Sequence, residues 1–216
     1  MKKIAFTGTH GTGKTTLAYG TGAELQKLGY NTKIINETAR ETQFNLNDET
    51  TYEAQVDIIA RQVRNELDAS IRPVDYIVTD RTVMDAVAYT KNAEMVGTIE
   101  LGWSQALFPL ARKWLDTYDL IFYVEPPFDI EEKVREETVK REEVMEKINE
   151  MHVGEDITFP FADGVRWASY QAMRAINDIL YTLYSDNGVP IVVISSSRTL
   201  QERLPFVIET VLGVTE

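Results

Sequence analysis

Gly8-Thr9-His10-Gly11-Thr12-Gly13-Lys14-Thr15 is the stretch of sequence that decides how this chain folds. It matches the phosphate-loop pattern G-x-x-x-x-G-K-[S/T] at every specified position. An apolar run at 3–7 precedes it and a helical pattern follows from Thr16 onward, which is the context that the pattern requires. The sequence therefore predicts a buried strand, a phosphate-binding loop and a helix in direct succession.

The residue types of this loop suit a bound triphosphate. Glycines let the backbone curl so that successive N–H groups point inward, and the following helix directs its positive dipole end at the same point. Lys14 adds a cation for the β- and γ-phosphates, and the Thr15 hydroxyl is placed to ligate Mg²⁺. A role for His10 as a base is a minor alternative. The residues expected to bind the nucleotide are Gly8, His10, Gly11, Thr12, Gly13, Lys14, Thr15 and Thr16.

Short apolar runs alternate with helical patterns along the chain. The runs are rich in Ile, Val, Phe and Tyr without polar alternation, which is typical of strands buried on both faces of a parallel sheet. The predicted strands are Lys3–Thr7, Lys33–Asn36, Tyr76–Thr79, Leu120–Val124 and Ile191–Ser195. The predicted helices are Thr15–Leu28, Thr51–Ser70, Thr82–Thr90, Gln105–Asp116, Trp167–Tyr184 and Thr199–Leu212. The second of them places Gln55, Ile59, Val63 and Leu67 at i+4 spacing, and Thr199 with Glu202 fits a capping box at the start of the last. This order predicts a doubly wound α/β domain.

Length and composition fit one domain over residues 1–216 and exclude several chemistries. The chain has no cysteine, and its 22 basic and 34 acidic side chains give a net charge of −12. Missing cysteines exclude disulfides, thiol nucleophiles and thiol-ligated metals, and they fit a cytoplasmic location. An acidic chain is a poor partner for nucleic acid or anionic membrane, and no apolar run approaches the ~18 residues of a membrane helix.

The charge is unevenly distributed. Residues 1–44 carry six basic and three acidic side chains, so the remainder carries −15. Residues 129–150 hold nine acidic and five basic side chains, with pairs at i,i+4 spacing that are typical of a solvated helix. The alternative is a lid in which Arg135 or Arg141 reaches an anion. Together with the irregular pattern at 151–164, this predicts a lid or insert around 129–166.

Polar side chains follow the second and third predicted strands. In open α/β sheets, ligands bind beyond the carboxyl ends of the strands. Asp80 is therefore placed to hold Mg²⁺, directly or through water, and Arg81 to reach a phosphate. Glu37 is placed to accept a proton from an attacking hydroxyl, and Arg40 to clamp an acceptor phosphate. The alternatives are an N-cap acid for Asp80 and a capping and salt-bridge pair for Glu37 and Arg40.

Two residues on the following helices complete the expected site. Gln55 lies on a largely apolar helix face, where a buried amide needs partners that the base or sugar of a substrate would supply. The alternative for Gln55 is an ordinary polar helix residue. Asp85 lies four residues after Arg81 on the same predicted helix, and we interpret it as a structural partner of that arginine.

Four segments carry a resemblance to a known superfamily. They are GTHGTGKTT at 8–16, ETAR at 37–40, DRTVMDAVAY at 80–89 and FADGVRW at 161–167. In this order they resemble the P-loop nucleoside and nucleotide kinases, most of all the nicotinamide riboside kinase-like AAA/ATPase family, with features of thymidylate and deoxynucleoside kinases. The resemblance spans most of the chain, and its loop motif is the most specific part.

The resemblance implies a three-layer α/β/α sandwich with five parallel strands in the order 2-3-1-4-5, and a helical lid. It also implies ATP and Mg²⁺ as cofactors and a homo-oligomer, since such relatives are often dimers or larger. The implied roles are Asp80 beside Mg²⁺, Arg81 beside the phosphates, Glu37 as general base, Arg166 in the lid over the transferring phosphate, and Ser196 and Arg198 beside the adenine ring. The alternative for Arg166 is an exposed arginine at a helix start.

The sequence therefore favours an ATP- and Mg²⁺-dependent phosphotransferase that acts on a nucleoside or nucleotide, a small acceptor that suits an acidic protein. One alternative is an NTP-hydrolysing switch, but the nearest base-reading motif, Thr90-Lys91-Asn92-Ala93, lacks the required aspartate. Another is a kinase of a polynucleotide end or of a modified base in DNA, which needs a basic track that this sequence does not show.

Overall fold

The computed structural model describes residues 1–126 and 170–213. In chain order the elements are β1 Lys2–Thr7, α1 Lys14–Lys27, β2 Thr32–Ile35, the 3₁₀ turns η1 Thr38–Arg40 and η2 Asn47–Glu49, α2 Tyr52–Ser70, β3 Tyr76–Asp80, α3 Val83–Val96, α4 Trp103–Leu115, β4 Leu120–Val124, α6 Tyr170–Ser185, β5 Val192–Ile194 and α7 Leu200–Leu212. Each observed strand lies within one residue of its predicted bounds.

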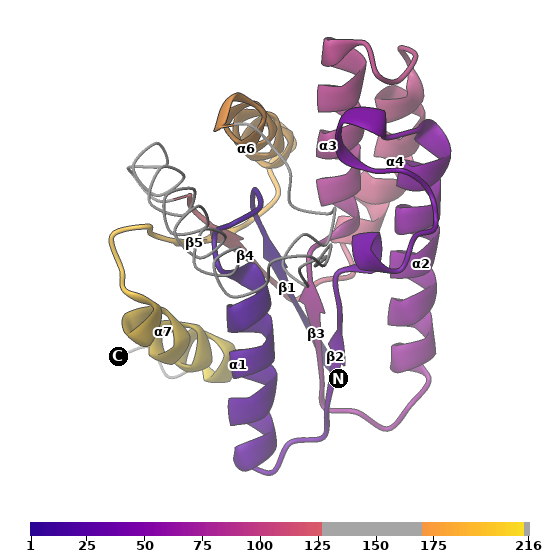
Figure 1. Cartoon of the computed structure of the whole chain (residues 1–216). Helices are drawn as coiled ribbons and strands as arrows, with labels where there is room; N and C mark the ends of the chain where they lie inside the picture. The colour runs from indigo at the N-terminus through magenta and orange to yellow at the C-terminus, as the bar shows by residue number, and fades with distance from the viewer. Residues whose placement is uncertain (127–169, 214–216) are drawn as a thin grey trace, which may run out of the picture.

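The strands form one parallel sheet in the order β2-β3-β1-β4-β5, as predicted. Helices cover both faces, which gives the predicted three-layer sandwich (Figure 1). Residues along β1 divide between the two layers: Ile4 and Phe6 pack with α1 and α7, whereas Ala5 packs with α2, α3, α4 and α6. Burial on both faces explains why the strands read as continuous apolar runs.

The strand order places the phosphate loop, which follows β1, at the centre of this sheet. β1 lies between β3 and β4, so the loop after β1 adjoins the ends of both neighbours. At Gly8, φ is +137° and an added Cβ would lie 2.6 Å from the carbonyl oxygen of Val124 on β4. Only glycine combines that backbone conformation with that close approach. The sharp turn out of β1 therefore depends on this residue.

Two helices near the site begin with a capping box, of which the sequence predicts the second. Thr82 caps α3 in a capping box with Asp85, and Thr199 caps α7 in a capping box with Glu202. Since Thr82 is the N-cap of α3, the alternative interpretation of Asp80 as that helix's capping acid is wrong. α3 also runs to Val96, further than predicted, and ends at Gly97 in the left-handed conformation.

The buried face of α2 differs from the i+4 row of Gln55, Ile59, Val63 and Leu67 that the sequence suggests. Leu67 is 52% exposed, whereas Gln62 and Glu66 are 2% and 0% exposed. An i+4 row drifts around the helix by about 40° per step, because 3.6 residues make one turn. Two polar residues thus occupy the end of the helix face that the row was expected to fill.

Among the described residues, none of the helices combines the length and apolar character needed to cross a membrane. The predicted lid at 129–166 lies outside the residues that the structure describes, which are 1–126 and 170–213. The assignment of residues 1–216 to a single domain with a lid stays a prediction.

Candidate active site

The phosphate loop, residues 8–13, is positioned by contacts with α6. The Thr9 hydroxyl donates to the carbonyl oxygen of Met173 at 3.1 Å, and the Thr12 hydroxyl donates to the carbonyl oxygen of Thr9 at 3.2 Å. Gly13 enters α1 at φ +90°, in the left-handed region, without a side-chain cap. With no side chain among the described residues capping it, the first turn of α1 presents its N–H groups in the arrangement that binds phosphates at helix N-termini.

Lys14 is buried with its ammonium group turned onto the loop. Its Nζ donates to the carbonyl oxygen of Thr9 and lies 3.3 Å from the Thr12 hydroxyl. Burial, reinforced by the positive charge of Arg81, lowers the pKa of Lys14 to about 7. An anion that entered the loop would favour the charged amine and reverse this shift. Thr16, by contrast, is exposed.

Thr15 and Asp80 meet at the point expected for Mg²⁺. The Thr15 hydroxyl donates to Asp80 Oδ2 at 2.7 Å, while buried Asp80 Oδ1 has no hydrogen-bond partner among the described residues. Burial raises the pKa of Asp80, so a cation beside it would be stabilising. A hydroxyl and an unpartnered carboxylate oxygen are oxygen ligands of the kind that Mg²⁺ prefers, so these residues fit the metal. Within the described residues there is no group of three or more His, Cys, Asp and Glu side chains that could hold a metal ion.

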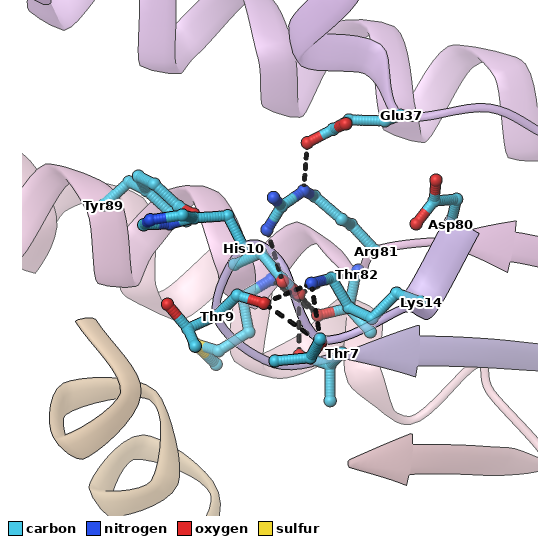
Figure 2. Close-up of polar contacts among 12 residues, drawn as sticks. Thr7, Thr9, His10, Lys14, Glu37, Asp80, Arg81, Thr82 and Tyr89 are labelled. Atoms are coloured by element: carbon cyan, nitrogen blue, oxygen red, sulfur yellow. Dashed lines mark hydrogen bonds and ion pairs between the residues drawn. The ribbon is translucent and has the colours of Figure 1, made fainter. Parts of the chain in front are cut away.

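Arg81 lies between Glu37 and the phosphate loop, as Figure 2 shows. Its Nε contacts Glu37 Oε1 at 2.5 Å, its Nη1 contacts Asp85 Oδ1 at 3.2 Å, and its guanidinium lies 5.3 Å from the centre of the Tyr89 ring. Burial opposes its charge, but Tyr89, Glu37 and the nearby aspartates keep the pKa of Arg81 above its ordinary value. The predicted partnership of Arg81 and Asp85 is confirmed.

The Glu37 carboxylate is held by two arginines. Besides Arg81, Arg40 Nε contacts Glu37 Oε2 at 3.1 Å, so the salt bridge that the sequence offered as an alternative is present. Burial alone would raise the pKa of Glu37, but the charge and hydrogen bond of Arg81 outweigh it and lower the pKa to about 2. Glu37 is therefore ionised at neutral pH and is a weak base, better suited to orienting a hydroxyl than to removing its proton early.

His10 turns toward α3 rather than toward Lys14. Its Nδ1 lies 3.1 Å from the Tyr89 hydroxyl, and its buried Nε2 has no partner among the described residues. Burial and the charge of Arg81 lower the pKa of His10 to about 4, so the imidazole is neutral at pH 7. This placement puts His10 against the residues that surround Arg81.

Gln55 lies at the start of α2, and only the NH₂ end of its amide has a hydrogen-bond partner among the described residues. Its Nε2 donates to the Thr50 hydroxyl at 3.0 Å, and its Oε1 is buried without a partner among the described residues. At 4% exposed, this amide leaves one acceptor that a ligand could satisfy. Gln55 is therefore a buried residue, and both its role toward a substrate and the alternative of an ordinary polar helix residue stay predictions.

Comparison with known proteins agrees with this geometry. A family model described as an AAA domain matches residues 3–159. The chain belongs to this AAA domain family. A curated protein, the probable thymidylate kinase of Thermoplasma acidophilum, is 28% identical over 137 residues, which cover 62% of this chain and 66% of that protein, just under two thirds of its length.

Solved structures show the same fold over nearly the whole length. Deoxyadenosine kinase from M. mycoides with the products dCMP and dCDP has a TM-score of 0.61, with 16% identity, 98% of this chain and 99% of that chain covered. The same enzyme with dATP has a TM-score of 0.60, with 15% identity and coverage of 98% and 100%. Together with the phosphate loop, these likenesses show that the chain has the P-loop kinase fold.

The chain also contains a residue of this region that sequence reasoning missed. Arg203 on α7 donates from Nη1 to the carbonyl oxygen of Thr12 at 3.1 Å, from Nη2 to that of Ser196 at 3.2 Å and from Nε to that of Arg198 at 2.9 Å. The Arg198 guanidinium itself lies 4.5 Å from the centre of the Phe206 ring. Arg203 thus joins the phosphate loop to the segment expected beside adenine. Nothing in the local sequence distinguishes it from a surface arginine.

The remaining predicted site residue, Arg166, lies outside the described residues. Seven of the other predicted site residues fall into two groups. Lys14, Thr15, Asp80, Arg81 and Glu37 converge at the carboxyl ends of β1, β2 and β3, and Ser196 and Arg198 follow β5 on the other side of the loop.

Proposed function

We propose that this AAA domain is an ATP- and Mg²⁺-dependent phosphotransferase that moves the γ-phosphoryl group to a hydroxyl or phosphate of a nucleoside or nucleotide. The observation that carries the proposal is the buried ion pair of Arg81 and Glu37 beside the phosphate loop. Its carboxylate and guanidinium lie where they could hold and orient an acceptor, and in-line transfer to a second substrate requires such positioning.

The residues divide the work of in-line transfer. An acceptor oxygen forms a bond to the γ-phosphorus while the bond from that phosphorus to the bridging oxygen of ADP breaks. With a hydroxyl acceptor, the proton passes late to the Glu37 carboxylate, which first orients it. Lys14 and Arg81 offset the charge on the transferring group, which matters more than base strength because the transition state is loose.

Thr15 and Asp80 would hold Mg²⁺ in this reaction. When bound, the metal would neutralise charge on the β- and γ-phosphates. The Thr15 hydroxyl would then turn from Asp80 Oδ2, its present partner, to the metal. The unpartnered Oδ1 of Asp80 is the oxygen most in need of such a partner.

A coupled ATP-consumption screen tests the proposal. Nucleosides, nucleoside monophosphates and nicotinamide riboside are offered with Mg²⁺, and product is confirmed by mass spectrometry. We expect one acceptor class to raise ATP turnover at least ~10-fold above hydrolysis, and Glu37→Gln to lower that turnover by ~100-fold. Glu41→Gln, an exposed neighbour on the same segment, is the matched control.

Two results would reject the proposal. Turnover that is unchanged by Lys14→Ala would show that the phosphate loop is not the reacting site. Hydrolysis that no acceptor accelerates, and that Glu37→Gln leaves intact, would instead identify a nucleotide-hydrolysing switch.

A further inference from the structure

Gln62 is a buried amide directly behind the ion pair of Arg81 and Glu37. It lies on α2, is 2% exposed and touches residues on both sides of that pair. Its Oε1 accepts from the hydroxyl of Thr38, the residue after Glu37, at 3.3 Å. Its Nε2 lies 3.4 Å from the carbonyl oxygen of Arg81. One amide group therefore contacts the backbone segment of each partner.

The orientation of this amide is set by Glu66. Gln62 Nε2 donates to Glu66 Oε1 at 2.7 Å, and Lys3 Nζ lies 2.9 Å from Glu66 Oε2. A carboxylate paired with a lysine only accepts hydrogen bonds, so the NH₂ end of the amide must face it. The oxygen of Gln62 is then left to face Thr38.

The Arg81 backbone needs such support. Its φ is +91°, in the left-handed region that non-glycine residues enter only with backbone strain. The described contacts of its main chain are the N–H bond to the carbonyl oxygen of Phe6 at 2.9 Å and the contact with Gln62. This conformation directs the Arg81 side chain to Glu37 rather than along the strand (Figure 2). Removing one of these two backbone contacts would hold the Arg81 side chain less firmly against Glu37.

We infer that Gln62 is a positioning residue, which holds Glu37 and Arg81 in the geometry for phosphoryl transfer through Thr38 and the Arg81 main chain. The inference rests on the proposed function. Gln62 touches neither partner's charged group, so its effect is indirect. Misplacing reacting groups by about 1 Å costs up to ~100-fold in rate, and loss of such supporting contacts commonly costs ~10–100-fold at designed and natural sites.

The test compares Gln62→Met with Tyr118→Phe. Methionine keeps the length of the side chain and removes both polar ends. Tyr118 donates to the same Oε1 of Glu66 at 2.6 Å but has no described contact with Thr38 or Arg81, so it is the matched control. We expect kcat to fall ~10–100-fold in Gln62→Met, with KM for ATP within ~2-fold, and kcat in Tyr118→Phe to stay within ~2-fold.

A second readout does not depend on catalysis. Carboxyl ¹³C NMR titration measures the pKa of Glu37, which Arg81 holds at about 2. A looser ion pair raises that pKa, so we expect a rise of about one pH unit or more in Gln62→Met and none in Tyr118→Phe. Thr38→Val, which removes only the hydroxyl facing Gln62 and Ile58, serves if Gln62→Met does not fold, and we expect the same direction with a smaller shift.

The outcomes separate the two proposals. An unchanged Glu37 pKa in Gln62→Met, or an equal loss of kcat in Gln62→Met and Tyr118→Phe, would overturn the positioning role and leave Gln62 a structural residue. If the wild-type chain phosphorylates no acceptor, the proposed function fails, while the NMR titration still decides whether Gln62 sets the Glu37–Arg81 geometry.

Discussion

Two buried ion pairs lie near opposite ends of the parallel strands and differ in how many hydrogen-bond partners their surroundings supply. Lys3, near the start of β1, pairs with Glu66 at 2.9 Å, and Arg81, just after β3, pairs with Glu37 at 2.5 Å. The Glu66 carboxylate accepts from four side chains, and the Lys3 ammonium also lies over two aromatic rings. The four donors to Glu66 are Lys3, Gln62, Trp114 and Tyr118.

On the side of the pair after β3, several buried polar atoms lack hydrogen-bond partners among the described residues. Among the described residues, buried atoms without partners include Asp80 Oδ1, His10 Nε2 and Gln55 Oε1, and Arg81 carries a strained φ. Native proteins leave few buried polar atoms unpartnered, because each costs about 1–3 kcal/mol. The difference teaches that the Glu66 carboxylate has its hydrogen-bond partners within the protein, whereas the Glu37 end has buried polar atoms that a ligand could satisfy.

The largest expected effect comes from Lys14→Met, which should separate activity from stability. We expect kcat/KM to fall ~1000-fold, since a cation on the transferring phosphate is lost. Burial lowers the Lys14 pKa to about 7 from an ordinary 10.5, so the unfolded chain binds more protons between pH 7 and 10.5. Wild-type stability therefore rises with pH across that window, and Lys14→Met should flatten the rise.

Urea unfolding at pH 7 and pH 10, combined with ATP-turnover assays, checks this expectation. Lys27→Met, on the exposed last turn of α1, is the control. A variant that unfolded more easily than wild type at pH 7 would show that Lys14 belongs with the stabilising pair rather than with the ligand site.

The second effect concerns the other pair. Lys3→Met should lower the free energy of unfolding by about 3–5 kcal/mol, because it leaves the Glu66 carboxylate buried without its cation. The turnover of folded molecules should change little. Calorimetry and activity at saturating ATP measure the two quantities, with exposed Lys2→Met as the neighbouring control. A selective loss of activity without loss of stability would contradict the division between the two ends.

The third effect is a pH dependence at the Glu37 end. The pKa of Glu37 is about 2 in the folded chain against an ordinary 4.5, so the ion pair contributes stability that is fully present above about pH 4.5 and is lost as the pH falls toward 2. The contribution is about 3 kcal/mol. In Glu37→Gln, acid should therefore weaken folding less across this window. Denaturant midpoints between pH 2.5 and 7 decide the matter, and parallel curves for variant and wild type would refute it.

The smallest expected effect is on stability, when each of two glycines with positive φ is replaced by alanine. Gly8→Ala combines φ +137° with a Cβ placed 2.6 Å from the Val124 carbonyl oxygen, whereas Gly29→Ala combines φ +91° with open space. We expect losses of about 2–3 kcal/mol and about 1 kcal/mol respectively, and only Gly8→Ala should also weaken nucleotide binding. Thermal shift with and without ATP provides both values. Equal losses would mean that the approach to β4 carries no strain of its own.

Much of the fold could be predicted from local pattern. The apolar runs, the phosphate-loop glycines and the capping box of Thr199 with Glu202 each depend on residues close in sequence, so periodicity and motif were enough to predict them. The strand order came from resemblance rather than from these patterns. Arg81 and Asp85 could be paired in advance because they are four residues apart in the sequence, although Arg81 precedes the helix that carries Asp85.

The contacts that periodicity could not predict are those between distant segments. Glu66 meets Lys3 across 63 positions of sequence, Arg203 meets Thr12 across 191, and neither residue type in its local context points to its partner. A helical pattern shows which side of a helix is apolar, but drift along that side decides which polar residues enter the core. Gln62 and Glu66 entered where Leu67 was expected.

The sequence by itself determined the local chemistry: a glycine-rich loop that must curl, strands that must be covered on both faces, and carboxylates at strand ends. Only the tertiary structure decided how those groups share charge. Glu37 was predicted as a proton acceptor, and packing against Arg81 and Arg40 makes it a weak one, with a pKa of about 2. The physical reason is that desolvation and charge pairing depend on which residues meet in the folded chain, and no local pattern specifies that.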